Sequence, residues 1–335
     1  MSASVCGEYF KASMAVIHHD LSTMNSSDPK LKIVIICGAT GIGKSSVGIE
    51  LAEKLGGEII SADSMQIYRY MDIGTAKPTP AELERIVHHL IDIVDPDEEY
   101  DAVRFSKQAR ERIAEIGGRG LLPIVVGGTG LYIKALLHGL FQSKPVDPRV
   151  RNRLRQDAEE KGSIFLYERL QAIDPASADR LHPNDTYRII RALETIETTG
   201  QSISDLHQDH GFEDDPYTAL KIGLQMDRGK LYERIDQRVD LMIGAGLVDE
   251  VKKLLDMGCT PELKSMQSIG YRHVAEFLQD NLPWDECVRT LKRDTRRFAK
   301  RQFTWFGADP QINWYAPDQL QDIVGSVKNF LTSTR

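Results

Sequence analysis

The feature that most limits how this chain can fold is an eight-residue segment, Gly38 to Ser45. It fits the pattern G-x-x-x-x-G-K-[ST]. An apolar run over 32–37 precedes it, and a segment with helical periodicity over 45–55 follows it. A glycine-rich turn between a strand and a helix exposes backbone N–H groups that cradle phosphate oxygens. The segment therefore predicts a phosphate-binding loop, or P-loop, in a parallel α/β sheet.

The residues of this loop have distinct expected roles in holding a di- or triphosphate. The ammonium of Lys44 would neutralise phosphate charge, and the hydroxyl of Ser45 would ligate Mg²⁺, the one metal ion that we predict. Kinases, ATPases and other nucleotide-binding or ATP-binding enzymes share the loop, so the pattern alone does not identify the ligand. The residues expected to bind the phosphate groups are Gly38, Ala39, Thr40, Gly41, Ile42, Gly43, Lys44 and Ser45.

Two further apolar runs end at polar residues in the same way. Residues 58–61 lead to Asp63, residues 121–126 lead to a glycine-rich segment around Thr129, and a helix is expected over 101–115 between them. Because ligands of parallel α/β sheets bind at the carboxyl ends of the strands, we expect both segments to lie beside the P-loop. At that position Asp63 is either a Walker-B-type aspartate that helps hold magnesium or a general base acting on an acceptor nucleophile.

Changes in periodicity divide the chain into four parts. We expect a disordered N-terminal extension without a targeting signal, followed by a P-loop NTPase-like α/β core with a parallel sheet. Strand signals then vanish, and three segments with helical periodicity, 149–161, 164–173 and 185–199, predict a helical insertion domain. A strand over 220–224 is expected to return to the sheet, with helices from there to the C-terminus. The predicted boundaries are 1–30, 31–146, 147–215 and 216–335.

The distribution of charge limits which partners fit. The chain has 42 basic and 49 acidic residues, a net charge of −7, which argues against a protein that coats nucleic acid with its whole surface. The segment 289–301 differs because it holds seven basic residues and a single acidic one, Asp294. Spacings of three and four place most of the basic residues on one helix face, which predicts a phosphate-binding stripe. They are Arg289, Lys292, Arg293, Arg296, Arg297, Lys300 and Arg301.

The apolar runs, cysteines and histidines exclude several other classes of protein. The longest apolar runs fall far short of the ~18 residues that a membrane span needs. The four cysteines contain no C-x-x-C pair, so we expect neither a disulfide framework nor a Cys-rich zinc site. His88 and His89 are expected to point to different faces of a helix, and His207 and His210 lack a third ligand nearby. We therefore predict a soluble, cytoplasmic protein.

Longer segments carry a resemblance to one enzyme family. Residues 63–68, followed by 71–78, closely resemble the signature of tRNA dimethylallyltransferases, and later segments are similar to motifs of that family in the same order. The resemblance covers about residues 32–306. Val87 and Tyr187 replace the proline and glutamine common in the family, but neither departure removes a chemical group that the reaction needs. The later segments are 88–92, 127–132, 182–185 with Arg188 and Arg191, 268–272 and 301–305.

This resemblance implies an activity and its partners. The family transfers a dimethylallyl group from dimethylallyl diphosphate to N6 of the adenosine on the 3′ side of the anticodon in tRNA, releasing diphosphate. The P-loop then holds this diphosphate rather than ATP. Asp63 is the implied base, Thr129 a second contact to the adenine amine or leaving group, and Lys44 and Arg238 stabilise the leaving diphosphate. The implied partners are the anticodon stem-loop of tRNA and dimethylallyl diphosphate, for a monomeric enzyme without a membrane.

The resemblance also implies where tRNA is bound. An adenosine stacked in the anticodon loop is unreachable, so a channel must receive an extruded base. The helical insertion is implied to clamp the anticodon stem-loop. The implied tRNA contacts are Asp63, Ser64, Met65, Gln66, Thr129, Arg151, Tyr187, Arg188, Ile189, Ile190, Arg191, Gln267, Ser268, Ile269, Gly270, Tyr271 and Arg272.

Three other functions stay open at the level of sequence. A related enzyme prenylates free AMP, ADP or ATP, but a mononucleotide needs neither a long helical insertion nor a basic C-terminal helix. A kinase or an RNA-stimulated ATPase would use the same P-loop on ATP. An RNA-binding module could retain the loop without catalysis. Assays with dimethylallyl diphosphate, tRNA, AMP and ATP separate these functions.

Overall fold

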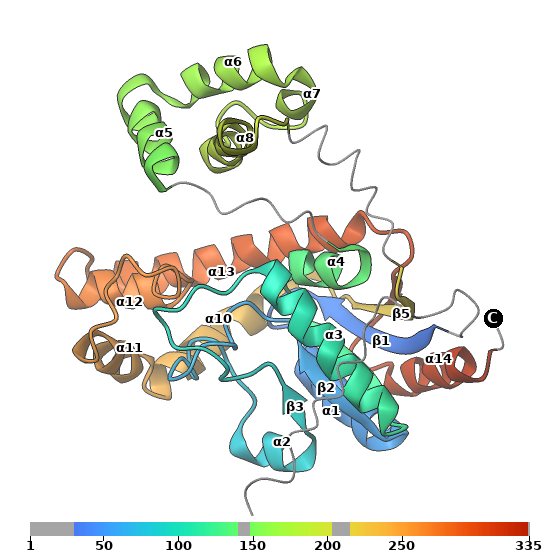
Figure 1. Ribbon diagram of the computed structural model, residues 1–335. Coiled ribbons are helices and arrows are strands. Elements are labelled where there is room, and N and C mark those ends of the chain that lie inside the picture. Colours follow the sequence, from blue (N-terminus) through green and yellow to red (C-terminus); the bar gives the residue numbers. More distant parts are fainter. Residues whose placement is uncertain (1–29, 140–147, 203–214, 334–335) are drawn as a thin grey trace, which may run out of the picture. The chain divides into compact units, whose positions relative to one another are not determined.

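The described part of the chain forms a six-stranded, parallel β-sheet. The computed structural model describes residues 30–139, 148–202 and 215–333 (Figure 1). Within these residues the strand order is β3-β2-β4-β1-β5-β6, and every neighbouring pair is parallel. Strands and helices alternate in the first half of the core, which confirms the predicted α/β fold with a P-loop-like sheet. The strands are β1 (Leu31–Gly38), β2 (Gly57–Ser61), β3 (His88–His89), β4 (Leu122–Gly127), β5 (Tyr217–Leu224) and β6 (Asn313–Tyr315).

The central strand β1 is covered on both faces. Its residues Ile33 and Ile35 belong to one hydrophobic cluster. Val34 and Ile36 belong to a second one, and all four side chains are fully buried. Side chains of a strand point alternately to its two faces, so the two clusters lie on opposite sides of the sheet. A strand buried on both sides reads as a continuous apolar run, which is why the sequence alone predicts it.

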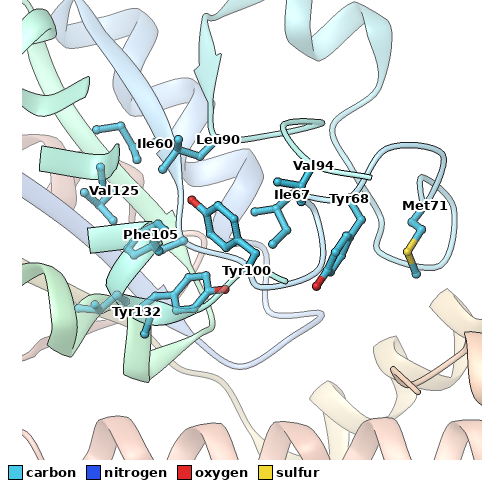
Figure 2. Packing of buried hydrophobic residues seen from close by; sticks show 14 of the residues in the cluster. Ile60, Ile67, Tyr68, Met71, Leu90, Val94, Tyr100, Phe105, Val125 and Tyr132 are labelled. Atoms are coloured by element: carbon cyan, nitrogen blue, oxygen red, sulfur yellow. The ribbon is translucent and has the colours of Figure 1, made fainter. Parts of the chain in front are cut away.

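Different helices cover the two faces of the sheet. On the face of Ile35, α3 and α4 contribute Phe105 and Tyr132, whose rings stack with their centroids 4.4 Å apart (Figure 2). On the other face, α1 and α14 contribute Val47 and Ile323. The helices outside the insertion are α1 (Lys44–Leu55), α2 (Pro80–Arg85), α3 (Ala102–Gly118), α4 (Gly130–His138), α10 (Arg228–Gly244), α11 (Leu247–Asp256), α12 (Tyr271–Leu278), α13 (Trp284–Gly307) and α14 (Leu320–Thr332).

Two short strands differ from the sequence expectation. His88 and His89 form strand β3 rather than part of a helix, and His89 Nε2 lies 2.7 Å from Glu58 Oε2. Strand β6 lies in the C-terminal region, where only helices are expected. The two strands have two and three residues, too few for a period of two to be recognised. Their backbone partners on β2 and β5 come from distant parts of the sequence.

The helical insertion has a hydrophobic core of its own. Its helices within the described residues are α5 (Pro148–Lys161), α6 (Ser163–Ile173), α7 (Pro175–Ala178) and α8 (Thr186–Thr199). Leu154, Leu166 and Leu193 are fully buried in this core. The flanking segments 140–147 and 203–214, and the predicted N-terminal extension up to residue 29, lie outside the described residues.

Candidate active site

The P-loop, Asp63 and Thr129 lie at neighbouring strand ends. Strands β1, β4 and β2 are adjacent in the sheet, and their carboxyl ends lead into the P-loop, Thr129 and Asp63. Hydrogen bonds of Thr129 connect the segments after β2 and β4. Thr129 N donates to Ala62 O at 3.2 Å, and Thr129 Oγ1 accepts from Ser64 N at 3.1 Å. The three motifs found in the sequence therefore form one continuous site.

A cavity of about 360 Å³, here called the diphosphate cavity, opens above these strand ends. Lys44 and Ser45 of the P-loop line it, together with Asp63 and Arg238 of α10. The N-cap of α1 is Gly43, with a φ of 109°, and no side chain caps the first turn of this helix. The backbone N–H groups at the start of α1 are therefore left for an anion, as in other phosphate sites at helix N-termini.

The electrostatics of the diphosphate cavity favour an anion. Burial lowers the pKa of Lys44 from its ordinary 10.5 to about 8, while Asp63 opposes this shift and Arg238 adds to it. Burial also lowers the pKa of Arg238, and Asp63 opposes that shift as well. Lys44 Nζ donates to Ala39 O at 2.8 Å, and within the described residues neither cation forms an ion pair. Two desolvated cations that share the charge of one carboxylate, Asp63, without a direct ion pair to it favour the binding of an anion.

Asp63 keeps one carboxylate oxygen free of hydrogen bonds. Its Oδ1 accepts from Met65 N at 2.9 Å and from Gln66 N at 3.4 Å, which orients the side chain in the turn after β2. In the part of the chain that the structure describes, Oδ2 has no hydrogen-bond partner, and the residue is half-buried. An oriented carboxylate with a free oxygen at a cavity wall can accept a proton from a bound substrate.

A second cavity, of about 340 Å³, meets the first at Asp63; we call it the channel. Thr129 and Ser64 line it beside Asp63, and Thr40 and Arg238 border both cavities. Asp63 therefore stands between a cationic cavity and one with a largely apolar wall. That wall consists of Ile235, Val239, Met242, Leu247 and Ile269.

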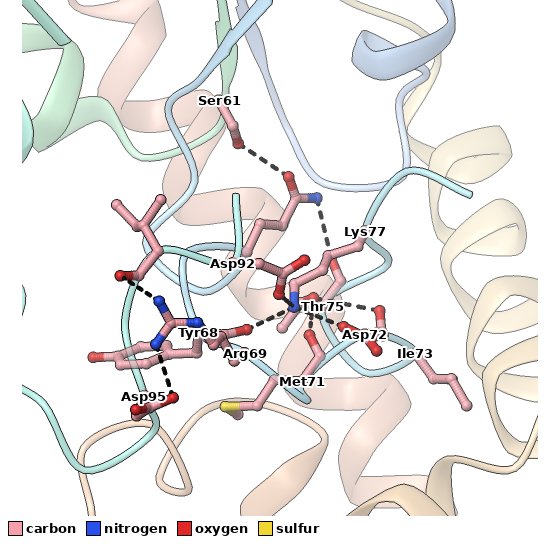
Figure 3. A network of polar contacts seen from close by, with 12 residues as sticks. Ser61, Tyr68, Arg69, Met71, Asp72, Ile73, Thr75, Lys77, Asp92 and Asp95 are labelled. Carbon is pink, nitrogen blue, oxygen red and sulfur yellow. Dashed lines mark hydrogen bonds and ion pairs between the residues drawn. The ribbon is translucent and has the colours of Figure 1, made fainter. Parts of the chain in front are cut away.

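The segment 71–77 borders both cavities and is held by polar contacts (Figure 3). Lys77 Nζ donates to Asp72 Oδ1 at 2.6 Å within this segment. Gln66 Nε2 donates to Ala76 O at 3.1 Å. Gln66, expected to contact tRNA, thus lines the diphosphate cavity with an amide that is already bonded to the protein.

Glu250 of α11 holds the same segment from another direction. Its carboxylate accepts hydrogen bonds from the backbone N–H groups of Asp72, Ile73 and Gly74 at 3.0, 2.8 and 3.1 Å. The hydroxyl of Tyr271 donates to the same carboxylate at 2.6 Å. No local sequence pattern points to Glu250, because the three N–H groups lie 176 to 178 residues away along the chain.

Two residues expected to contact tRNA are buried. Tyr271 is fully buried, with its hydroxyl on Glu250. Ile189 is fully buried in the core of the insertion. Both side chains are used in packing, although Tyr271 also lines the channel, and their expected tRNA contacts stay predictions. Tyr187, beside Ile189 on α8, is 80% exposed and remains available to a ligand.

The other expected tRNA contacts fall into two groups. In the insertion, Arg151 and Arg191 both bind the buried carboxylate of Glu194, and Arg188 binds Asp185. Ile190 is half-buried against the insertion core. Around the channel, Arg272 Nη2 donates to Asp294 at 2.7 Å. The expected tRNA contacts that line the channel are Asp63, Ser64, Met65, Thr129, Gln267, Ser268, Ile269, Gly270 and Tyr271.

Ion pairs occupy much of the basic stripe on α13. Lys292 and Arg296 pair with Asp240 and Asp236 of α10, at 2.6 and 2.5 Å. The sequence placed a single acid against seven bases, but these two partners lie more than 50 residues away and become neighbours through helix packing. The stripe is therefore not free as a whole to bind phosphate. The exposed cations of the stripe that form no pair with α10 are Arg289, Arg297, Lys300 and Arg301.

Comparisons with known proteins agree on one family. The model of the family described as IPP transferase matches residues 66–309, and that of isopentenyl transferase matches residues 31–93. The chain belongs to the IPP transferase family. It is therefore a transferase. Five of the motifs recognised in the sequence, 63–68, 71–78, 127–132, 268–272 and 301–305, contribute residues to the two cavities.

Relatives of this IPP transferase are similar over almost their whole length. A tRNA dimethylallyltransferase of Desulfosudis oleivorans is 51% identical over 301 residues, which cover 90% of this chain and 96% of that protein. A tRNA dimethylallyltransferase 2 of Syntrophus aciditrophicus is 50% identical over 308 residues, covering 92% and 99%.

Solved structures give the same result. The tRNA isopentenylpyrophosphate transferase of Bacillus halodurans has a TM-score of 0.68 and 41% identity, covering 90% of this chain and 96% of that one. A eukaryotic dimethylallyltransferase acting on tRNA has a TM-score of 0.71 and 29% identity, covering 89% and 77%.

Proposed function

We propose that this IPP transferase moves a dimethylallyl group from dimethylallyl diphosphate to N6 of the adenosine on the 3′ side of the anticodon in tRNA. The observation that carries this proposal is the pair of cavities that meet at Asp63, one cationic and one with an apolar wall. A diphosphate joined to a five-carbon apolar chain needs both environments. A nucleotide hydrolase needs the cationic cavity only.

The diphosphate cavity supports the leaving group. As the bond between C1 of the allyl group and the diphosphate oxygen breaks, negative charge grows on that oxygen. Lys44, Arg238 and the N–H groups at the start of α1 are positioned to stabilise this charge. The N–H of Thr40 is an exception, because it already donates to Gln302 Oε1 at 2.8 Å. Thr40 still lines the diphosphate cavity, so its expected contact with the diphosphate stays a prediction.

Asp63 supports the attacking side of the reaction. The N6 nitrogen forms a bond to C1 while its proton passes to the free carboxylate oxygen of Asp63. Thr129 Oγ1 accepts from Ser64 N at 3.1 Å and donates to Ser64 Oγ over a long 3.4 Å, and this hydroxyl hydrogen can turn to a substrate acceptor instead. The channel accepts the extruded adenosine, and its apolar wall keeps water from the electron-poor carbon.

The donor groups of the diphosphate cavity fit Mg²⁺. The Ser45 hydroxyl is exposed at the start of α1 and makes no hydrogen bond within the described residues, and the Asp63 carboxylate lines the same cavity. Mg²⁺ prefers such oxygen ligands together with phosphate oxygens. We propose that Ser45 holds the ion against the diphosphate, where it would supply positive charge to the leaving group.

The insertion and α13 supply groups for tRNA. Arg188 and Tyr187 of α8 are exposed, and Lys300 and Arg301 of α13 are exposed as well. A guanidinium bound to one carboxylate still has unused donors for a phosphate. We propose that these surfaces bind the anticodon stem-loop, and that a single chain acts as a cytoplasmic monomer. None of the described helices is long and apolar enough to cross a membrane.

The test is an incubation of the full chain with labelled dimethylallyl diphosphate, Mg²⁺ and either bulk tRNA or AMP. We expect label in tRNA only, at the adenosine beside the anticodon, and labelling slower by ~10²–10⁴-fold with Asp63→Ala. Label in AMP would instead identify an adenylate isopentenyltransferase. In a parallel reaction, tRNA-stimulated hydrolysis of ATP without any prenyl transfer would refute the proposal.

A further inference from the structure

We propose that Gln302 is a positioning residue, one that sets the P-loop and the segment after β4 at the spacing that prenyl transfer requires. Gln302 lies near the C-terminal end of α13 and is 6% exposed. This inference rests on the proposed function and adds a residue to which the sequence analysis gave no role.

The side-chain amide of Gln302 connects two neighbouring strand ends. Its Oε1 accepts from Thr40 N in the P-loop at 2.8 Å, and its Nε2 donates to Gly128 O after β4 at 2.8 Å. One partner requires an acceptor and the other a donor, and both are buried or half-buried backbone groups. Among side chains of this length, a neutral amide provides both functions at once.

The glycines around Thr129 make room for this contact. A Cβ atom on Gly128 would lie 2.3 Å from Gln302 Nε2, and one on Gly130 would lie 2.1 Å from Trp305 Nε1. Gln302 and Trp305 are three residues apart, so they lie on one face of α13. The glycine-rich segment after β4 and the segment 301–305 therefore form a single packed contact, although they are far apart in the sequence.

The bonded groups lead directly to the reacting positions. The residue after Gly128 is Thr129, whose N–H and Oγ1 bind the turn that carries Asp63. On the other side, Thr40 belongs to the loop that would hold the leaving diphosphate. Gln302 thus links the leaving-group side to the base side through two hydrogen bonds. A displacement of ~1 Å between such groups can lower a rate by about 10²-fold.

Three variants of the full chain separate positioning from packing. Gln302→Met keeps the side-chain length and apolar volume but loses both hydrogen bonds. Gln302→Glu keeps the acceptor for Thr40 N while its second oxygen faces Gly128 O. Thr290→Val is the matched control, because Thr290 is another buried polar residue of α13 whose hydroxyl bonds only within its own helix.

We expect Gln302→Met to lower kcat by ~10–100-fold at a temperature where it is fully folded, with the KM for tRNA within about twofold of wild type. Thr290→Val should keep its kcat, whatever its melting temperature. For Gln302→Glu, we expect the kcat relative to wild type at the same pH to depend on the protonation of the new carboxyl group. This ratio should rise by up to about tenfold for each unit by which the pH falls, until the carboxyl group is fully protonated. The neutral acid can donate to Gly128 O and so replaces the lost amide.

A normal kcat for folded Gln302→Met, or an equal loss in Thr290→Val, would overturn the proposal. If Gln302→Met does not fold, the pH dependence of Gln302→Glu decides instead, and a constant ratio to wild type contradicts a positioning role. Wild-type enzyme in the same assay separates the two levels of inference. Without prenyl transfer by wild type, the proposed function fails; with it, the variants test Gln302 alone.

Discussion

Lys44 provides a quantitative test of the diphosphate cavity. Its pKa of about 8, against the ordinary 10.5, corresponds to about 3 kcal/mol that disfavours the ammonium form in the ligand-free protein, at about 1.36 kcal/mol per pH unit. Burial is the largest cause of this shift. A bound diphosphate places negative charge beside the ammonium and favours it again, so protonation and ligand binding are linked.

For activity, we expect kcat/KM for dimethylallyl diphosphate to fall by about tenfold per pH unit above about pH 8, because the free enzyme then loses the Lys44 ammonium. The kcat at saturating substrate should hold to higher pH, since the bound diphosphate raises the pKa of Lys44. The assay is initial-rate prenyl transfer at saturating tRNA from about pH 6.5 to about pH 9.5. The control is Lys44→Arg, whose guanidinium stays charged throughout.

For stability, the sign follows from the lowered pKa. Between about pH 8 and about pH 10.4 the unfolded state holds a proton on Lys44 that the folded state has lost, so the free energy of unfolding rises with pH in this window. Below about pH 8 the charged, buried Lys44 lowers the free energy of unfolding by the full amount of about 3 kcal/mol. Lys44→Met removes this destabilisation. It also removes the hydrogen bond to Ala39 O, which contributes about 1 kcal/mol.

At pH 7 the ligand-free Lys44→Met protein should therefore be more stable than wild type by about 2 kcal/mol, with a melting temperature a few degrees higher and most activity lost. Differential scanning calorimetry at about pH 7 and about pH 10 measures the difference, which should shrink at the higher pH. The reasoning is refuted by a wild-type kcat/KM that stays flat to about pH 9.5. It is equally refuted if Lys44→Met is less stable than wild type at pH 7.

Three further predictions follow from particular contacts. Asp63→Ala should lower turnover by ~10²–10⁴-fold and leave the binding of dimethylallyl diphosphate nearly unchanged. A single-turnover rate above about a tenth of the wild-type rate would contradict the role of Asp63 as the base. Lys300→Ala should lower the slope of log affinity for tRNA against log salt concentration by about one. Arg296→Ala should change this slope little, because Asp236 already holds the Arg296 guanidinium. Equal changes in the two variants would show that this ion pair opens when tRNA binds. Glu250→Gln leaves a single acceptor oxygen for three backbone N–H groups. In urea unfolding it should therefore lower the free energy of unfolding by ~1–3 kcal/mol. An unchanged midpoint would show that the segment 71–77 is held without this carboxylate.

Local patterns in the sequence were sufficient for the sheet core and for the centre of the site. The apolar run of β1 and the glycine spacing after it depend only on residues close together in the chain, so the P-loop is predictable. The positions of Asp63 and Thr129 follow from a general rule, because ligands of parallel sheets bind at the carboxyl ends of strands. Strands β3 and β6 were missed because so short a segment has no periodicity.

The contacts that connect these pieces came only from the tertiary structure. Gln302 lies 262 residues from Thr40 and 174 residues from Gly128, and the carboxylates that neutralise Lys292 and Arg296 come from another helix. A periodic pattern specifies which face of a helix is apolar, but it does not specify which polar group of a distant segment will lie opposite. The same arginine spacing is equally compatible with ion pairs and with solvent-exposed charges. In the same way, the burial of Tyr271 against Glu250 depends on how α11 and α12 pack. The sequence alone therefore determined the chemistry of the phosphate site, whereas helix packing decided which polar residues hold that site together and which remain free for tRNA.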